Sequence, residues 1–509
     1  MKPTKTRRDK GFAVITTTLA LVATMLVAGL GFDVATLYLI RTKLQGAVDA
    51  ATLAAVRALA QNGNMPAAQT VGTEFLTANF PTNYWGAQAL ASMPVSSALT
   101  VSLVDQNNNS ATAGTTATAK LVKANVGVSA PLYFLRALGQ KNANIYASAQ
   151  AKRQGLLVFL VLDGSGSMAN LISGTEAFVW AMNDAHAFLG NPQFDPDIDR
   201  IGLVVYGGTT YTVAPIANFQ APAGTINTTS TVYTALTSYG NGGSGNTNTV
   251  EGLQAAYTAM QTFYGGAGVS PTRENVVILM TDGAPNGFTA DWSTQLKGGA
   301  DKCGPAVAGG SMIGYTARET PTEEGIFNVT PVNTAQMPGA TAGGAAGMVS
   351  NNGNCAMNPT NWASFYKDFN QVPTTTAYGD ALTGAGTYLT TTSLLLTGVD
   401  GSNQTLDLAA DEQQFHDISC NAADGAATRL RSDATLRIAI YTIALAGNSN
   451  GNTYDMLDAT LLQRMANATT SPIFNPSQPV GAYFYAQDAT YLGTEFTAVA
   501  SQISARLSR

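Results

Sequence analysis

The chain has 509 residues, of which 11% are charged, and its formal net charge is -6. This length exceeds what a single hydrophobic core organises, so two or three domains are expected. The acidic balance provides no basic surface for a polyanion and argues against a nucleic-acid partner. Low charge together with abundant Gly, Ala, Thr, Ser and Asn fits an extracytoplasmic bacterial surface protein better than a cytosolic enzyme.

The N-terminus predicts a membrane anchor that is retained. Residues 1–11 form a basic tail, and residues 12–32 carry no charge over a length that covers about 30 Å as a helix. The basic flank is expected to stay in the cytoplasm and to send the bulk of the chain across the inner membrane in a single pass. A cleaved signal peptide is the alternative, but the apolar run continues into further helix, so we assign residues 12–40 to a transmembrane helix.

The helical pattern extends beyond the membrane segment as an amphipathic stalk. Its apolar residues recur at intervals of three and four: Leu37, Ile40, Leu44, Val48, Ala51, Ala55 and Leu59. Asp33 precedes this stripe near the outer end of the apolar segment. We expect it at the membrane–water interface, where a charge costs little, and a functional carboxylate inside the membrane is the alternative.

Residues 61–152 read as a small α+β unit. A helical stretch at 67–78 is followed by alternating apolar residues in 99–103, 122–128 and 145–151, which predict strands. A short helix ended by Gly139 is expected between the last two strands. The region shows no site chemistry, so we predict that 41–152 is a stalk and spacer domain.

From residue 153 to 509 the pattern alternates between strands and helices. Such alternation predicts an α/β fold with a doubly wound, mostly parallel sheet. One strand follows its predecessor so closely that it must be antiparallel to it. The expected strands are 156–162, 201–206, 211–216, 276–280, 436–445 and 483–486, and the expected helices are 176–189, 250–264, 412–431, 454–466 and 492–507.

Oxygen-bearing side chains follow two of the buried strands. Asp163, Ser165 and Ser167 come directly after the strand 156–162, and Asp282 follows the strand 276–280. Thr247 stands where a loop passes into a helix. Ligands of parallel sheets bind beyond the carboxyl ends of the strands, and hard oxygen donors favour Mg²⁺, Mn²⁺ or Ca²⁺ over zinc or copper. Ordinary Gly/Ser/Asp turns are the competing interpretation.

The segments DGSGS, TNT and TDG resemble, in this order, the metal-ion-dependent adhesion site of the von Willebrand factor A family. The resemblance implies that Ser165, Ser167 and Thr247 bind the ion, and that Asp163 and Asp282 bind it directly or through water. It also implies one open position for a partner's carboxylate. The opening residues 7–55 resemble the N-terminus of TadG-like proteins of the tight-adherence (Tad) pilus-assembly system, which join such a membrane segment to a von Willebrand A domain.

A long segment, 284–406, separates Asp282 from the next predicted helix. Because it begins beside the predicted site, it is expected near the rim, either covering the partner-binding surface or as a decoration without a binding role. The three cysteines are Cys303, Cys355 and Cys420, without CxxC spacing. An oxidising compartment predicts one disulfide, either Cys303–Cys355 or Cys355–Cys420.

The resemblance to TadG-like proteins implies a non-enzymatic envelope protein that assists pilus assembly or anchoring, or adhesion. It would bind an acidic side chain of a protein partner through a divalent cation, with Mg²⁺ as the first candidate and Mn²⁺ or Ca²⁺ as alternatives. The alternative is a metal-dependent extracytoplasmic hydrolase, which needs a general base that the motif does not supply. The only histidines, His186 and His416, lie in helical patterns outside any catalytic frame, and no P-loop or GxGxxG motif suggests a nucleotide.

Overall fold

The structure is a computed structural model in which the chain divides into two compact units. Unit 1 comprises Met1–Ala111, Ala119–Arg153 and Leu507–Arg509, and unit 2 comprises Thr112–Thr118 and Gln154–Arg506. The residues that the structure describes are 8–207, 210–221, 223–238, 247–269, 271–291, 312–315, 325–328, 372–384, 386–389, 408–446 and 457–507.

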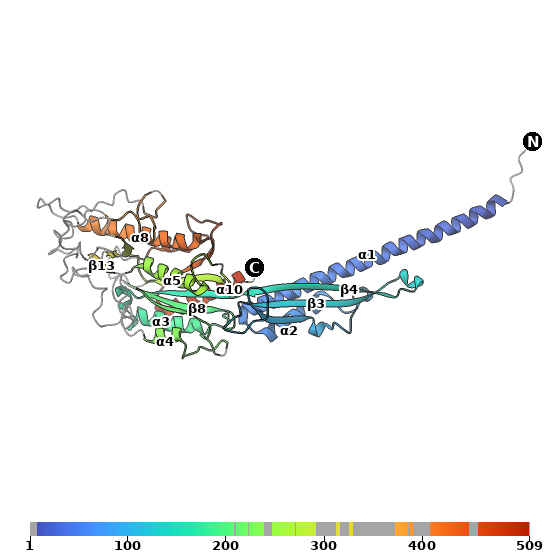
Figure 1. The fold of residues 1–509 in the computed structure, drawn as a ribbon, viewed down its shortest axis with the longest axis horizontal. Helices are drawn as coiled ribbons and strands as arrows, with labels where there is room; N and C mark the ends of the chain where they lie inside the picture. The colour runs from blue at the N-terminus through green and yellow to red at the C-terminus, as the bar shows by residue number, and fades with distance from the viewer. Residues whose placement is uncertain are drawn as a thin grey trace, which may run out of the picture. The chain divides into compact units, whose positions relative to one another are not determined.

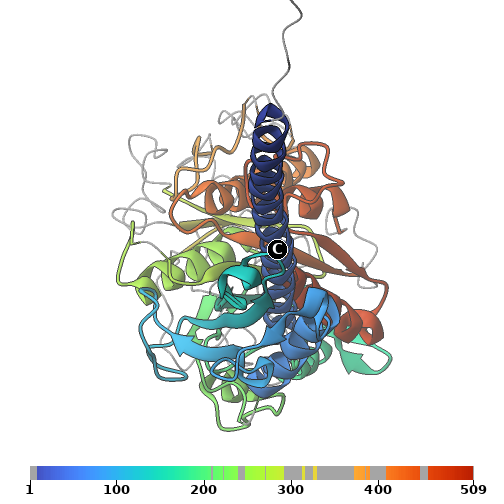
Figure 2. The ribbon, with the colours of Figure 1, turned by 90° about the vertical axis from the view of Figure 1, so that its right-hand side faces the viewer.

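Unit 1 is built on one continuous helix, α1 (Arg8–Asn62) (Figures 1 and 2). Its first half exposes large apolar side chains, such as Phe12, Val27 and Leu30, over a segment long and apolar enough to cross a membrane. In its second half the predicted stripe from Ile40 to Leu59 is buried, which confirms the expected amphipathic pattern. The two halves therefore differ: the first is exposed over most of its length, and the second is packed.

The buried stripe of α1 packs into the core of unit 1. The helix α2, short 3₁₀ turns and a four-stranded sheet complete this core. The predicted stalk is thus part of the α+β unit rather than a separate rod, because an apolar stripe of this length requires a covering surface. The elements are α2 (Met65–Asn79), η1 (Tyr84–Gly86), β1 (Gln88–Ala89), η2 (Val95–Ser97), β2 (Leu99–Val104), β3 (Ala119–Pro131), η3 (Leu135–Leu138) and β4 (Asn142–Gln154).

Unit 2 contains a six-stranded sheet in the order β15-β14-β10-β5-β8-β9. All neighbours are parallel except β8 and β9, which form the expected antiparallel edge. Every residue of β5 and β8 is buried, as continuous apolar runs in a parallel sheet require. The strands are β5 (Leu156–Asp163), β8 (Arg200–Tyr206), β9 (Thr210–Ile216), β10 (Glu274–Thr281), β14 (Ala439–Leu445) and β15 (Tyr483–Ala486).

Helices cover both faces of this sheet, so the fold is the predicted α/β, doubly wound type. Figure 1 shows α5 and α8 on one side and α3 and α4 on the other. The helix α4 and the small sheet β11-β12-β13 were not predicted from the sequence. The bounds are α3 (Ala177–Leu189), α4 (Thr231–Ser238), α5 (Thr249–Tyr264), α8 (Leu408–Ser432), α9 (Ala459–Met465), α10 (Leu492–Leu507), β11 (Gly287–Ala290), β12 (Met312–Tyr315) and β13 (Gly325–Asn328).

Candidate metal centre

The parallel register of the sheet places Asp163 between two hydroxyl donors. β5 lies between β10 and β8, with Leu162 opposite Met280 and Asp163 opposite Tyr206. Thr281 therefore reaches the level of Asp163 on the other side. The Thr281 hydroxyl donates to Asp163 Oδ2 at 2.6 Å, and the Tyr206 hydroxyl donates to the same oxygen at 3.3 Å.

Burial makes Asp163 an unusual carboxylate. Its side chain has no solvent exposure, and this burial raises the pKa of the carboxyl above its ordinary value, against the lowering effect of its hydrogen bonds. Burial and the neighbouring Asp163 also raise the pKa of Tyr206. Within the described part of the chain, the hydrogen-bond donors to Asp163 are all neutral. A cation bound at this edge would supply the missing positive charge.

The turn after β5 directs both serines toward β10. The backbone N–H of Ser165 donates to Asp163 Oδ1 at 2.8 Å, which folds the turn back over the strand end. Gly164 is required there, because a Cβ would lie 2.9 Å from Val205 Cγ1. The Ser165 and Ser167 hydroxyls are 3.1 Å apart, and Ser167 Oγ donates to Asp282 Oδ1 at 2.7 Å.

Thr247 is held at the same edge through backbone contacts. Its N–H donates to Asn286 Oδ1 at 2.7 Å, and its carbonyl accepts from the Asn286 N–H at 3.2 Å. The next residue, Asn248, donates its N–H to the carbonyl of Gly207 at 3.3 Å, directly after β8. Asn248 also caps α5 by accepting from the Glu251 N–H. The Thr247 loop is thus fastened both to the end of β8 and to the loop after β10.

Four of the five predicted site residues are joined by direct hydrogen bonds. The fifth, Thr247, bonds instead to Asn286 in the loop after β10. The residues that sequence reasoning missed are Tyr206, Thr281 and Asn286, which orient Asp163 and hold the Thr247 loop. Tyr206 and Thr281 each end a buried strand, which the sequence indicated, but the sequence did not define the register that sets them beside Asp163. Asn286 carried no signal, because its partner lies 39 residues earlier in the chain.

The donor set fits a hard divalent cation. Carboxylate and hydroxyl oxygens meet at this edge, and these are the ligands of Mg²⁺, Mn²⁺ and Ca²⁺. Among the described residues, no group of three or more His, Cys, Asp and Glu side chains gathers as a metal cluster. A centre at this edge therefore depends on hydroxyl ligands, which sets it apart from zinc sites built of nitrogen and sulfur.

The start of the long insertion contacts the residue that follows Thr247. β11 is fully buried, and Asn248 Nδ2 donates to Thr289 Oγ1 at 3.0 Å. The insertion returns to the domain near Asp380, which pairs with Arg429 of α8 at 2.9 Å. Most of the segment between lies outside the described residues, so its proposed role in covering the partner surface stays a prediction.

The predicted disulfides can be tested at one cysteine. Cys303 and Cys355 lie outside the described residues. Cys420 is a free, buried thiol in α8, so the Cys355–Cys420 pair is not formed in this structure. Burial raises the pKa of this thiol well above its usual value, which keeps it protonated and unreactive.

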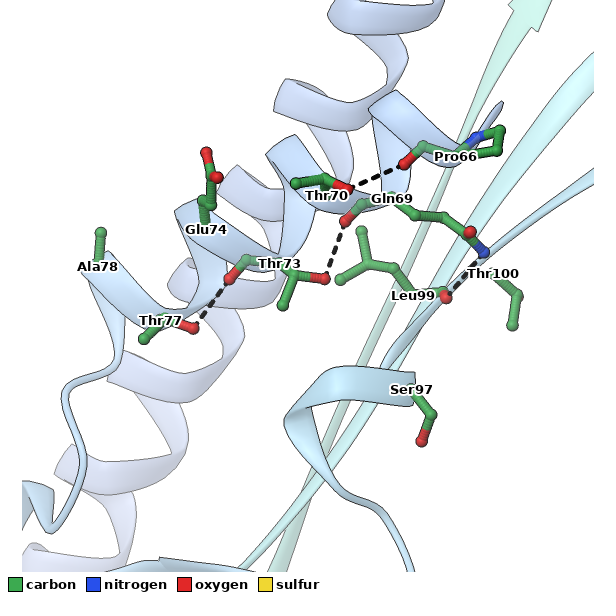
Figure 3. Close-up of a pocket in the computed structure, with 10 residues that line it drawn as sticks. All are labelled: Pro66, Gln69, Thr70, Thr73, Glu74, Thr77, Ala78, Ser97, Leu99 and Thr100. Atoms are coloured by element: carbon green, nitrogen blue, oxygen red, sulfur yellow. Dashed lines mark hydrogen bonds between the residues drawn. The ribbon is translucent and has the colours of Figure 1, made fainter. Parts of the chain in front are cut away.

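Unit 1 contains a large cavity of its own. It has a volume of about 1040 Å³ and lies between α2 and β2 (Figure 3). Its threonine hydroxyls donate to carbonyls of their own helix, as Thr70 does to Pro66 and Thr73 to Gln69. Glu74 is the only ionisable side chain of its described lining. The cavity therefore lacks a set of convergent catalytic groups.

Comparison with protein families gives two matches. The model for the von Willebrand factor type A domain matches residues 158–303, a segment that contains all five predicted site residues. The model described as putative Flp pilus-assembly TadE/G-like matches residues 11–58. No curated protein matches the sequence.

Solved structures with similar folds have low sequence identity. The pilus adhesin SpaC from Lactobacillus rhamnosus GG is 14% identical, with a TM-score of 0.34 over 83% of this chain. This chain covers 36% of SpaC. The PilB minor pilin from Streptococcus sanguinis is 14% identical, with a TM-score of 0.36 over 80% of this chain and 79% of PilB. The vWF domain of the type V pili tip protein Mfa5 from Porphyromonas gingivalis is 14% identical, with a TM-score of 0.34 over 70% of this chain and 96% of that domain.

Proposed function

We propose that this chain, which joins a TadE/G-like segment to a von Willebrand factor type A domain, is a membrane-anchored envelope protein that serves pilus assembly, pilus anchoring or adhesion. The proposed activity is recognition of an acidic side chain on a protein partner. A divalent cation at the β5 edge, Mg²⁺ first, would supply an open coordination position that attracts this carboxylate. The C-terminal unit thus binds, and the N-terminal helix holds the protein at the membrane.

The observation that carries the proposal is the convergence of oxygen-bearing side chains from two separate segments. Asp163, Ser165 and Ser167 come from the turn after β5, and Asp282 comes from the end of β10. The register of the parallel sheet brings the ends of β5 and β10 side by side. Ordinary turns after strands would not be expected to share side-chain hydrogen bonds. In the proposed centre these four residues and Thr247 hold the ion.

Three further side chains keep the proposed ligands in place. Thr281 and Tyr206 fix one oxygen of Asp163, which leaves the carboxylate a single orientation. Asn286 holds the backbone of Thr247 through two hydrogen bonds. Preorganised ligands lose little freedom when an ion binds, so these residues raise the affinity without touching the ion.

The positions of the two histidines favour partner recognition over metal-dependent hydrolysis. A metal-dependent hydrolase needs a general base beside the ion. His186 contacts the Tyr233 carbonyl and the Thr237 hydroxyl, and His416 lies next to Cys420 in α8. The printed contacts of both histidines are with residues other than the five proposed ligands, and we propose that the protein is not an enzyme.

Partner capture tests the proposed recognition. The full chain, solubilised and immobilised, is exposed to envelope extracts with Mg²⁺ or with EDTA. The account expects a partner that is retained with Mg²⁺, lost with EDTA, and lost with Asp163→Ala. Asp184→Asn, which changes a half-buried carboxylate on α3, is the matched control and should retain the partner. Capture at full strength in EDTA would show a purely structural domain.

Topology is tested separately. We propose a single pass through the inner membrane, with the N-terminus in the cytoplasm and the rest outside. Protease added to spheroplasts should then degrade the chain after residue 41. Complete protection of that region would place it in the cytoplasm and contradict the proposed location.

A further inference from the structure

The connection between β3 and β4 docks onto α1 at Asp33. We call residues 132–141, which form this connection, the hairpin tip. Asp33 is 1% exposed, and its two carboxylate oxygens accept hydrogen bonds from the backbone N–H groups of Tyr133, Phe134 and Leu135 at 2.8–3.2 Å. The carboxylate thus satisfies the free N–H groups at the start of η3.

Apolar contacts fix the same junction. The ring of Phe32 packs edge-to-face against the rings of Tyr133 and Phe134, with centroids 5.8 Å apart in both pairs. Gly29 lets the tip approach the helix, because a Cβ there would lie 2.4 Å from the ring of Phe134. The hairpin of β3 and β4 runs beside α1 to this point (Figure 1). The tip is therefore held at one level along α1.

That level coincides with the outer end of the apolar segment. Residues 12–32 cover about 30 Å as a helix, the thickness of the hydrocarbon core. Gly29 and Phe32 lie in the last turn of this segment, and Asp33 follows it directly. A bilayer that surrounds the exposed apolar half of α1 must therefore reach the tip as well.

The surface of the tip has the composition of a membrane interface. Tyr133 is 48% exposed, Phe134 49% and Leu138 66%. Two exposed cations, Arg136 and Lys141, flank these side chains. Aromatic rings and long basic side chains are favoured at the level of the lipid headgroups, where their apolar parts are buried and their polar ends are hydrated.

We propose that the hairpin tip is a second membrane contact, in which Tyr133, Phe134 and Leu138 enter the outer leaflet while Arg136 and Lys141 meet lipid phosphates. The inference rests on the membrane anchoring proposed above. Together with α1, the tip makes a two-point attachment that fixes the depth and the tilt of unit 1 in the bilayer. Asp33 is the residue that couples the two points, since it ties the tip to the helix.

The test is a depth measurement on the full chain in vesicles of phosphatidylethanolamine and phosphatidylglycerol. Cys303 and Cys355 are replaced by Ser and Cys420 by Ala, and a nitroxide label is attached at Leu138→Cys. Its collision rates with oxygen, which concentrates in lipid, and with a water-soluble nickel chelate are compared. Val27→Cys, 72% exposed within the apolar segment, is the lipid reference. Leu53→Cys, 63% exposed and about 39 Å farther along α1 than Val27, is the aqueous reference.

The proposal expects an oxygen-to-nickel ratio at Leu138 several-fold above that at Leu53, at a shallow lipid depth. A ratio equal to that at Leu53 would overturn it, with Val27 still in lipid. Low collision rates with both reagents would also overturn it, because the tip would then be covered by protein. If the label at Val27 itself behaves as aqueous, the membrane anchoring fails as well, so the two failures are distinguishable.

A pair of glycine variants tests whether docking sets the depth. Gly29→Val places a side chain against Phe134, whereas a Cβ at Gly31 meets nothing within 4 Å. Both variants add the same apolar group to the helix. Gly29→Val is expected to move the Leu138 ratio toward the aqueous value, and Gly31→Val to leave it unchanged. An equal response to the two variants would show that contact with α1 does not position the tip.

Discussion

Asp33 and Asp163 are both buried carboxylates, and they differ in what surrounds them. Asp33 in unit 1 accepts four hydrogen bonds, all from backbone N–H groups. Asp163 in unit 2 accepts one backbone N–H and two hydroxyls, and further oxygen atoms lie beside it. The first carboxylate has the donors that a buried anion needs. The second is bonded mainly by hydroxyls, which can accept as well as donate.

This difference separates a structural aspartate from a candidate ligand. Backbone N–H groups donate and cannot turn to accept, so they stabilise an anion without binding a cation. Hydroxyls donate or accept, and they can present lone pairs to a metal. Each site also has a helix glycine that admits an aromatic ring: Gly29 under Phe134, and Gly252 of α5, where a Cβ would lie 2.8 Å from the ring of Tyr206. The two sites thus share a glycine–aromatic contact, but their hydrogen-bonding groups differ.

Alanine at the two positions should give effects of different size. Asp33→Ala leaves three backbone N–H groups without their acceptor and should destabilise the docked tip by at least about 3 kcal/mol, at roughly 1–3 kcal/mol for each group. Asp163→Ala without divalent ions should cost less, since it also removes a desolvated charge and the Thr281 hydroxyl keeps the Gly283 carbonyl as a partner at 3.0 Å. Amide hydrogen exchange, followed at 133–135 and along β5, measures both. Equal losses of stability in the two variants would contradict the distinction between a structural aspartate and a candidate ligand.

Removal of a single serine hydroxyl at the proposed centre should have a smaller effect, on Mg²⁺ affinity. Ser167→Ala removes one proposed ligand and the hydrogen bond to Asp282, so Mg²⁺ affinity should fall about tenfold, or about 1.4 kcal/mol. Ser173→Ala is the matched control, because Ser173 is an exposed serine of the following turn. Titration calorimetry on the full chain compares the two. Identical affinities in both variants would remove Ser167 from the centre.

A third carboxylate, Asp184, is less buried than Asp33 and Asp163, and its replacement should have the smallest effect on stability. Asp184 on α3 is partly buried and accepts one backbone N–H, from Gly493, and burial raises its pKa to about 6. Because the folded-state pKa lies above the ordinary value, the contribution of Asp184 to stability is present at low pH and is lost as the pH rises through about 6. Asp184→Asn should therefore match wild type at about pH 4 and exceed it by about 1 kcal/mol at about pH 8, after discounting for solvent screening.

Thermal unfolding of the two proteins across this pH range measures the effect. A difference in stability that stays constant from about pH 4 to about pH 8 would show that Asp184 titrates normally.

The sequence allowed the sheet and most of the candidate centre to be predicted. Continuous apolar runs in β5 and β10 indicated strands buried on both faces, and motif positions directly after them indicated the edge where side chains meet. The short helix α4 was missed, because its sequence TVYTALTS is rich in β-branched residues that favour strands. Its helical state depends on tertiary packing, which local propensity does not describe.

Contacts between distant segments were beyond sequence reasoning. The stripe on α1 showed that one face is buried, but the covering sheet lies far along the chain. Asp33 was expected at the membrane interface, yet its partners, 100 residues away, could not be identified. The roles of Thr281 and Tyr206 follow from strand register, which the pattern of a single strand does not define.

Calorimetric titration of the full chain with Mg²⁺ and Mn²⁺ tests the proposed centre most directly. Wild type and the Asp184→Asn control should bind one ion with similar affinity, and Asp163→Ala should bind it at least about 100-fold more weakly, a loss of about 2.7 kcal/mol. Amide exchange should show that the fold of unit 2 persists in this variant. Undiminished ion binding by Asp163→Ala would contradict the proposed metal centre at the end of β5.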